Sequence, residues 1–254
     1  MPSFSIVPGV PFPLGRFAGL AALAGLAHGV STRSGPDLRP LTDSPAHAAA
    51  AGSLATALRL GSAAWLRQVH GSTVVTARSG GWLGEGDALV SARPGLAILV
   101  RSADCPLILA AALDARDRPV AVGAAHASWR STVAGIAPRM LATLCTLAGL
   151  PPSRVQAALA PSAGPCCYEV GPEVRAAALS VHGEAARTWF PERDGRLIFD
   201  LWRANAEQLA AAGLAPGRLE LAGICTICED AHFHSWRREG AAAGRFAAGI
   251  GLLA

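Results

Sequence analysis

Four extended apolar runs lie close together in the middle of the chain, and they constrain its fold more than any other feature. They cover residues 88–90, 96–101, 106–111 and 119–125, and short turn segments at 93–95, 102–105 and 114–118 separate them. Nearly continuous apolar sequence of this length is typical of strands that are buried on both faces. The runs therefore predict a sheet with a covering layer on each side.

The rest of the chain mixes helices and strands. Spacing and composition predict helices at residues 46–60, 132–147, 173–181 and 201–212. Apolar and β-branched runs predict strands at 73–76, 155–159, 219–224, 233–237 and 246–253. Asp43 or Ser44 is expected to cap the first helix, and Ser131 the second. Because the elements do not alternate strictly and no linker or repeat divides the chain, we expect one α+β domain over residues 1–254, a layered sandwich of mixed sheets with flanking helices.

Composition excludes several functional classes. All 22 basic residues are arginine, which rules out a Schiff-base lysine and a phosphate loop that ends in Gly-Lys-Ser or Gly-Lys-Thr. The net charge of +4 has no basic cluster interleaved with aromatic residues, so we expect no nucleic-acid partner. The apolar segment 17–27 is too short to cross a bilayer and lacks a cleavage site, which favours a cytoplasmic protein with no membrane contact. No obligate protein partner is indicated.

Three short polar motifs lie where extended runs meet turns or a helix: Gln68-Val69-His70-Gly71, Ala103-Asp104-Cys105-Pro106 and Ala125-His126-Ala127-Ser128-Trp129-Arg130. They supply one thiol and two imidazoles, which are good ligands for zinc or copper. Three protein ligands leave one coordination position open for water and substrate. Two alternatives stay open. The trio could belong to a metal-free enzyme with Cys105 as nucleophile and His126 as base, or to a non-catalytic metal-binding module with a fourth ligand.

The other cysteines are Cys145, Cys166, Cys167, Cys225 and Cys228. In a cytoplasmic chain we expect them to be thiols. Cys225-x-x-Cys228 has the spacing of half a zinc ribbon or of a redox pair, but no second Cys-x-x-Cys motif follows it. Adjacent cysteines at 166 and 167 are poorly spaced for chelation. His232 and His234 alternate on the predicted strand and share one face, for which we expect partial exposure. The sequence alone therefore favours no structural zinc site here.

These words occur in a recognisable order together with two later ones, Gly164-Pro165-Cys166-Cys167-Tyr168-Glu169-Val170-Gly171 and Ser235-Trp236-Arg237-Arg238…Gly244-Arg245. The set closely resembles the bacterial YfiH-like family, also called the laccase-domain or polyphenol oxidase family. The likeness runs from about His28 to the C-terminus and so covers nearly the whole chain. Five motifs in the same order make it specific.

The resemblance implies a fold similar to the catalytic domain of cytotoxic necrotizing factor. It also implies a zinc site, with copper as the alternative metal, formed by His70, Cys105 and His126, which would also be the catalytic residues. Family members are described as purine nucleoside phosphorylases with adenosine deaminase activity. We therefore expect a zinc-dependent enzyme that phosphorolyses adenosine, inosine, guanosine or methylthioadenosine and deaminates adenosine. Arginines would bind phosphate and nucleoside; the candidates are Arg33, Arg130 and Arg245.

Two rival functions accompany this resemblance. One is a cysteine amide hydrolase that edits peptidoglycan precursors. The other is a copper-dependent polyphenol oxidase, although the chain has only one His-x-His word, at His232 and His234. The chain also departs from the family word His-Ala-Gly-Trp-Arg-Gly, because Ser128 and Ser131 replace both glycines. Serine adds side-chain volume where the backbone can approach a substrate. We therefore expect these replacements to affect substrate preference more than metal binding.

Overall fold

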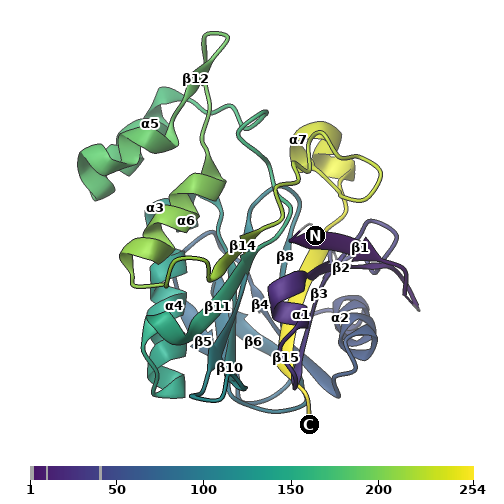
Figure 1. The fold of residues 1–254 in the computed structure, drawn as a ribbon. Helices are drawn as coiled ribbons and strands as arrows, with labels where there is room; N and C mark the ends of the chain where they lie inside the picture. Colours follow the sequence, from purple (N-terminus) through teal and green to yellow (C-terminus); the bar gives the residue numbers. More distant parts are fainter. Residues whose placement is uncertain (1–2, 10, 40–41) are drawn as a thin grey trace.

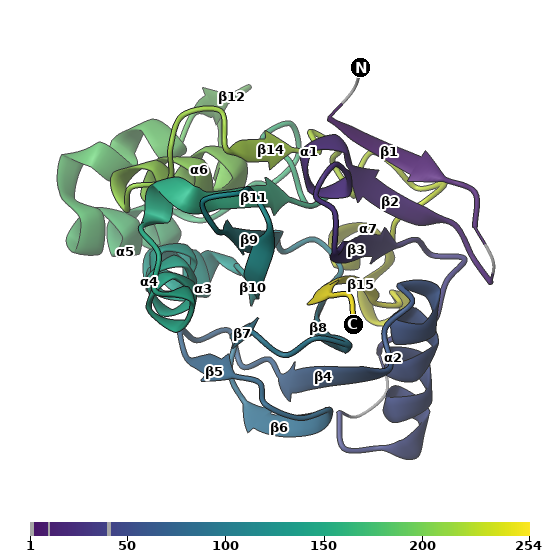
Figure 2. The same ribbon diagram turned by 60° about the horizontal axis from the view of Figure 1, so that its bottom comes forward.

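The computed structural model describes residues 3–9, 11–39 and 42–254. In it, two mixed β-sheets pack face to face with helices on both outer sides (Figure 1). Helix α2 (Pro45–Ala57) covers one sheet, and helix α4 (Ile136–Ala148) covers the other, as the turned view in Figure 2 makes plain. The expected α+β sandwich with flanking helices is confirmed.

The first sheet has seven strands in the order β1-β2-β3-β15-β8-β4-β6. Their bounds are β1 Phe4–Val7, β2 Leu14–Phe17, β3 Leu26–Ser31, β4 Ser62–Arg67, β6 Gly81–Glu85, β8 Leu96–Ser102 and β15 Phe246–Leu252. Strand β4 runs parallel to β6 and β8, and the other neighbours are antiparallel. The last strand in sequence, β15, is thus a central strand of this sheet.

The second sheet has six strands in the order β14-β11-β9-β10-β7-β5. Their bounds are β5 Val74–Thr76, β7 Ala88–Ser91, β9 Leu107–Leu113, β10 Pro119–His126, β11 Val155–Leu159 and β14 Leu219–Leu221. The outer pairs β5–β7 and β11–β14 are parallel, and the inner pairs are antiparallel. A separate hairpin joins β12 (Glu192–Arg193) to β13 (Arg196–Leu197).

The remaining helices are short or lie at one end of the sandwich. They are α1 Ala18–Ala21, α3 Trp129–Val133, α5 Pro172–His182, α6 Leu201–Ala211 and α7 Trp236–Glu239, with 3₁₀ turns η1 Pro152–Arg154, η2 Gly183–Trp189 and η3 Gly240–Ala242. Within the described ranges, no helix is long and apolar enough to cross a membrane.

Strand β9 explains the continuous apolar runs of the sequence. Its residues Leu107 and Leu109 belong to the core between the two sheets, whereas Ile108 and Ala110 belong to the core beneath α4. Alternate side chains of a strand point to opposite faces, so a strand with a layer on each side needs apolar residues throughout. Each large aliphatic side chain buried in this way contributes about 1.5–3 kcal/mol.

Three sequence predictions of local structure need correction. The expected helix over residues 132–147 is two helices, α3 and α4, because Gly135 lies between them with a φ of 76°, a conformation that favours glycine. Ser128, not Ser131, caps α3 by accepting the Ser131 N–H at 3.1 Å. Residues 233–237 are not a strand, since Ser235 caps α7 there. At α2, Ser44 is the capping residue.

Candidate active site

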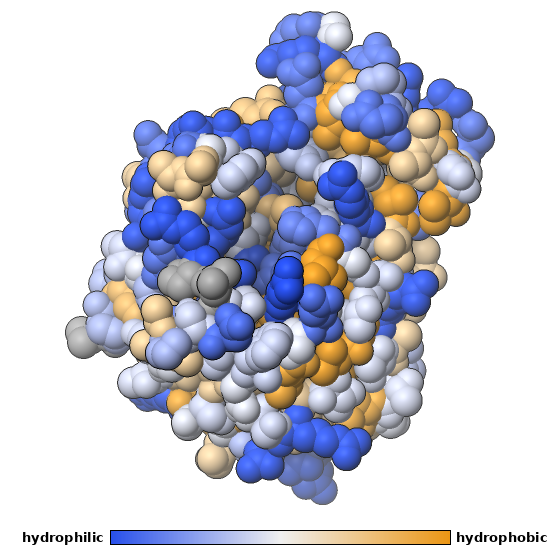
Figure 3. All heavy atoms as spheres, turned by 180° about the vertical axis from the view of Figure 1, so that it is seen from behind, coloured by the Kyte–Doolittle hydropathy of each residue, from blue (hydrophilic) through white to orange (hydrophobic). Residues whose placement is uncertain are grey.

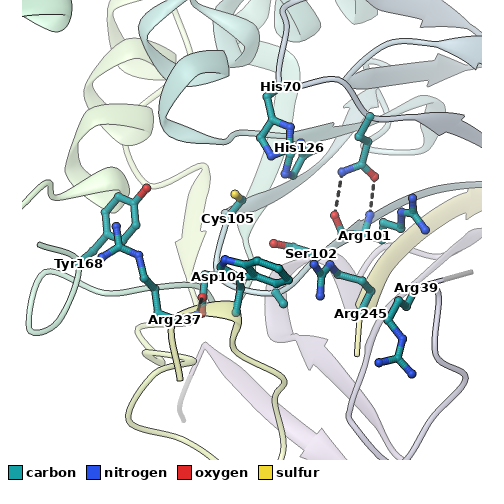
Figure 4. A pocket seen from close by; sticks show the side chains of 13 residues that line it. Arg39, His70, Arg101, Ser102, Asp104, Cys105, His126, Tyr168, Arg237 and Arg245 are labelled. Carbon is teal, nitrogen blue, oxygen red and sulfur yellow. Dashed lines mark hydrogen bonds between the residues drawn. The ribbon is translucent and has the colours of Figure 1, made fainter. Parts of the chain in front are cut away.

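Three chain reversals at one end of the sandwich bring together the residues expected to bind a metal. Cys105 lies between β8 and β9, His126 is the last residue of β10, and His70 follows β4. Each offers a ligand atom, and these atoms all lie within 4.8 Å of one another. Figure 4 shows both imidazole rings and the Cys105 sulfur facing the same space. The fold therefore assembles the trio that the sequence singled out.

A buried carboxylate, Asp87, holds two of these three groups in place. Its Oδ1 lies 2.9 Å from Nδ1 of His126 and accepts the backbone N–H of His70 at 3.0 Å. Its Oδ2 accepts the N–H groups of Val69, at 3.2 Å, and Gly71, at 2.7 Å. One carboxylate thus fixes both the His126 ring and the loop on which His70 has a φ of 60°, an uncommon conformation for a residue with a side chain.

The hydrogen bond from Asp87 settles which nitrogen of His126 is available. With Nδ1 bonded to the carboxylate, Nε2 is left to face Cys105 and His70, as in the carboxylate–histidine–metal arrangements of zinc enzymes. The two rings meet edge to face with centroids 5.0 Å apart. Two imidazoles and one thiolate in this geometry fit a zinc ion with an open position.

Charge interactions within the trio favour the thiolate. Burial of Cys105 opposes ionisation, but the positive charge and hydrogen bond of His126, with a hydrogen bond from His70, lower the pKa of Cys105 to about 6. Burial of His126 likewise opposes its protonation, but the Cys105 thiolate and Asp87 raise the pKa of His126 to about 9. Without a metal, Cys105 and His126 therefore form an ion pair near neutral pH.

The trio opens into a cavity of about 470 Å³, within the usual size range of small-molecule sites. Figure 3 shows hydrophilic side chains gathered around a hollow near the middle of one face of the molecule. In Figure 4, Tyr168 and Arg237 lie on one side of Cys105, and Arg39, Arg101 and Arg245 lie on the other. The lining residues are Arg39, Gln68, His70, Arg101, Ser102, Ala103, Asp104, Cys105, His126, Tyr168, Trp236, Arg237 and Arg245.

Only one of the three arginines predicted to bind substrate lines this cavity. Arg245 does so, with its guanidinium carbon 5.3 Å from the Trp236 ring centroid. Arg33 instead pairs with Glu239 at 3.5 Å, and Arg130 stacks on Trp129 at 4.3 Å. Neither of these two belongs to the cavity lining, so a substrate-binding role for them stays a prediction.

The sequence reasoning missed several residues that shape the site. Arg101 is held by Gln68, whose side chain exchanges two hydrogen bonds of 2.8 Å with the Arg101 backbone (Figure 4). Arg39 and Arg237 also line the cavity. The signal of Arg39 in the sequence is weak, because isolated arginines are common on surfaces, whereas Arg237 belongs to the Ser235-Trp236-Arg237-Arg238 motif but was not singled out within it. Asp87 had a better one: a single acidic residue stands directly before the buried strand β7.

The two serines that replace family glycines have a structural role. Both are buried, and their hydroxyl oxygens lie 2.8 Å apart. Ser128 caps α3, the helix that begins just after His126. The added side chains therefore satisfy each other below the site, and neither lines the cavity.

Comparison with known proteins places this geometry in a family. The family model "Multi-copper polyphenol oxidoreductase laccase" matches residues 39–253. The chain belongs to this laccase-like family. Among solved structures, YlmD from Geobacillus stearothermophilus covers all of both chains at 27% identity with a TM-score of 0.81. YfiH from Bacillus licheniformis shares the fold, with a TM-score of 0.82 over 98% of each chain at 23% identity.

Relatives in this family carry names from purine nucleoside chemistry. A protein from Deinococcus radiodurans named purine nucleoside phosphorylase is 40% identical, over 85% of this chain and 79% of its own length. One of the same name from Pseudomonas aeruginosa is 38% identical, over 74% of this chain and 73% of its own. A prokaryotic protein named adenosine deaminase is 37% identical, over 65% of this chain and 61% of its own.

Proposed function

We propose that this chain is a zinc-dependent purine nucleoside enzyme, which phosphorolyses purine nucleosides and deaminates adenosine. The observation that carries the proposal is that a zinc-type ligand trio and a group of arginines open into one cavity. The names of the relatives support the same substrate class. A cytoplasmic location remains part of this proposal.

His70, Cys105 and His126 would hold the metal. A zinc ion bound there would supply Lewis acidity to the cavity. The chain's own residues prepare this site before metal binding: Asp87 orients His126, and the protonated His126 ring favours the Cys105 thiolate. Zinc binding would release the proton from Nε2 of His126. A soft thiolate with two imidazoles selects zinc or copper over magnesium or calcium.

Arginines at one end of the cavity would bind phosphate. Burial and the neighbouring charge of Arg245 lower the pKa of Arg101, which indicates two cations held close together. A site of this kind favours an anion with several acceptor oxygens, as phosphate has. Trp236 and Tyr168, which also line the cavity, offer aromatic surface for a purine ring. Burial raises the pKa of Tyr168 to about 12, so its hydroxyl stays protonated and can donate a hydrogen bond.

A nucleoside assay tests this proposal. Purified protein is incubated with adenosine, with and without phosphate, and the products are separated by chromatography. Phosphorolysis yields adenine and ribose 1-phosphate only when phosphate is present. Deamination yields inosine, which accumulates without phosphate and is cleaved on to hypoxanthine and ribose 1-phosphate when phosphate is present. Asp87→Asn protein should be weakened in both reactions, because both would need the same metal, whereas the matched control Asp114→Asn should keep both. No turnover of adenosine, inosine or guanosine by zinc-loaded protein would contradict the proposal.

One specific observation favours a second candidate, a metal-free cysteine amide hydrolase. The side chains lie in space as in a catalytic triad: Cys105 as nucleophile contacts His126 as base, and Asp87 orients His126. The pKa of the Cys105 thiol is also lowered. In that reading, His126 would protonate the leaving amine, and Cys105 would carry the acyl group. A peptidoglycan precursor would be one possible substrate.

Chelation separates the two candidates. A zinc enzyme should lose activity when metal is removed and regain it when zinc is added. A cysteine hydrolase should keep or gain activity, because removing the metal frees the thiolate. Full adenosine turnover by verified metal-free protein would overturn the zinc proposal. Cys105→Ser does not discriminate, because both mechanisms need the sulfur.

A polyphenol oxidase with several copper ions has less support. Within the described residues, only one group of potential ligands contains histidine. His232 and His234 lie outside it and pair with Glu229 and Glu239, at 3.2 and 3.4 Å. A single copper in the His70–Cys105–His126 site remains the alternative to zinc.

A further inference from the structure

Two cysteine pairs that are about sixty residues apart in sequence meet in space. The loop after β11 carries one pair, and the loop after β14 carries the other. The four residues, called here the four-cysteine cluster, are Cys166, Cys167, Cys225 and Cys228. Their sulfur atoms all lie within 4.8 Å of one another. The sequence spacing, which gave no reason to join these pairs, was therefore misleading.

Backbone hydrogen bonds join the two loops at the base of the cluster. Ser162 donates its N–H to the Ile224 carbonyl at 3.1 Å, and Thr226 donates to the Ser162 carbonyl at 3.0 Å. Close packing continues at Gly164, where a Cβ atom would lie 3.1 Å from the Cys225 Cβ. The cysteines are thus held together by the fold and do not depend on a chance contact of mobile side chains.

We propose that the four-cysteine cluster binds one zinc ion, separate from the metal of the active site. A tetrahedral zinc with Zn–S bonds of about 2.3 Å places neighbouring sulfur atoms about 3.8 Å apart. The Cys228 sulfur lies 3.7 Å from that of Cys166 and 3.3 Å from that of Cys167. A disulfide would need about 2.05 Å and would use only two of the four thiols. Zinc uses all four.

The surroundings of Cys225 match those of a metal-bound thiolate. Its sulfur accepts the backbone N–H of Gly164 at 3.3 Å, and the N–H groups of Ile227 and Cys228 also face it. Ligating groups in structural metal sites are typically held by such outer hydrogen bonds. Arg238, which is ion-paired with Glu239, braces the loop by donating to the carbonyls of Thr226 and Ile227 at 2.6 and 3.1 Å.

The cluster also adjoins a wall of the active-site cavity. Thr226, next to Cys225, donates its hydroxyl hydrogen to Oδ1 of Asp104 at 2.7 Å, and Tyr168, next to Cys167, lines the cavity. A zinc ion here would clamp both loops and so fix Asp104 and Tyr168 against the site. Its role is structural, because four protein ligands leave no open position for substrate.

Metal content tests the proposal. Wild-type protein reconstituted with zinc under reducing conditions should bind about two zinc ions per chain. Cys228→Ser and His126→Ala should each bind about one, and the double variant about none. Cys145→Ala is the matched control, since this cysteine is buried under the second sheet, outside both sites, and it should keep two. Wild-type zinc content in Cys228→Ser, or a wild-type protein with only the zinc that His126→Ala removes, would overturn the proposal.

Cobalt substitution in the wild-type protein provides a second measurement that needs no variant. Cobalt bound by four thiolates gives a much stronger sulfur-to-metal charge-transfer band than cobalt bound by one, so loading both sites should give two spectrally distinct steps. A single step of one-thiolate intensity would refute the proposal. So would a disulfide among the cluster cysteines in air-purified protein, if the reduced protein then bound no additional zinc. Because the active-site metal is counted separately, failure of the nucleoside function leaves this test intact.

Discussion

Replacing Asp87 with asparagine tests how the active site is held. The buried carboxylate accepts hydrogen bonds from the N–H groups of Val69, His70 and Gly71 and from Nδ1 of His126, at 2.7 to 3.2 Å. Asparagine keeps the size but replaces one acceptor oxygen with an NH₂ donor. In place of Oδ1, that donor would face Nδ1 of His126 and the His70 N–H. In place of Oδ2, it would face the N–H groups of Val69 and Gly71. All of these groups are donors in the wild-type protein.

Each orientation of the new amide has a cost of its own. If the NH₂ faces His126, Nδ1 must become an acceptor, and the ring proton moves to Nε2, the nitrogen that would bind the proposed zinc ion. Losing the partner of a ligating histidine weakens metal binding by about 10- to 100-fold, or about 1.4–2.7 kcal/mol. If the NH₂ takes the place of Oδ2 instead, the partly buried N–H groups of Val69 and Gly71 lose their acceptor, and stability falls by up to about 1–3 kcal/mol.

Zinc affinity, measured by competition with a coloured chelator, tests whether Asp87→Asn weakens metal binding. The Cys228→Ser background restricts the measurement to the active site. Asp114→Asn is the matched control, because Asp114 also accepts two backbone N–H groups, from Arg116 and Arg118, in a turn of its own. We expect the control to bind zinc as the wild type does. An Asp87→Asn protein with both wild-type melting temperature and zinc affinity within about twofold of wild type would refute the reasoning.

Two further predictions concern phosphate binding and acid stability. Arg245→Ala should raise the KM for phosphate by about tenfold or more through loss of a charge-assisted bond, and deamination should be less affected. Arg33→Ala, outside the cavity lining, is the comparison. Equal losses of phosphorolysis and deamination in Arg245→Ala would argue against a phosphate role. Burial, helped by the charge of Arg16, lowers the pKa of His28 to about 3, and its neutral ring accepts the Phe17 N–H at 2.9 Å. This stabilisation is complete above the unfolded pKa of 6.5 and is lost as pH falls towards 3, so by about pH 5 the protein should lose about 2 kcal/mol through His28. In urea unfolding, His28→Gln, which keeps an acceptor, should lose correspondingly less over the same range, and equal losses would contradict the assignment.

The sequence predicted those parts of the sandwich in which burial of both strand faces produces a continuous apolar run. Strands β8, β9 and β10 have a layer on each side, so their uninterrupted apolar runs were decisive. The failures have local causes. Helical periodicity continues across Gly135, and a pattern of apolar positions does not register a left-handed residue. At residues 233–237, buried Phe233 and Ser235 imitate strand alternation, although Ser235 begins a helix.

For the candidate active site, the sequence predicted the three potential ligands but few of the residues that hold them in place. Imidazole and thiol are scarce groups, so three of them at strand ends were informative. Asp87 was missed because a carboxylate gives no sign of its hydrogen-bond partners until the chain is folded. The four-cysteine cluster was missed for a related reason: a parallel pair of strands, β11 and β14, brings the two loops together, and sequence separation does not reveal strand pairing.

Asp104 links the two sites. Its φ of 102° lies in a region that residues with side chains rarely adopt, and such a conformation persists only where the surroundings enforce it. Its carboxylate accepts the Thr226 hydroxyl and the Arg237 N–H, each at 2.7 Å, and its carbonyl accepts the Ala163 N–H at 2.7 Å. These three bonds come from the segments that carry the four-cysteine cluster and from the start of α7. The strained turn that presents Cys105 to the cavity is therefore held by the same loops that the proposed second zinc ion would clamp. Loosening the four-cysteine cluster should thus disturb the position of Cys105 through Asp104.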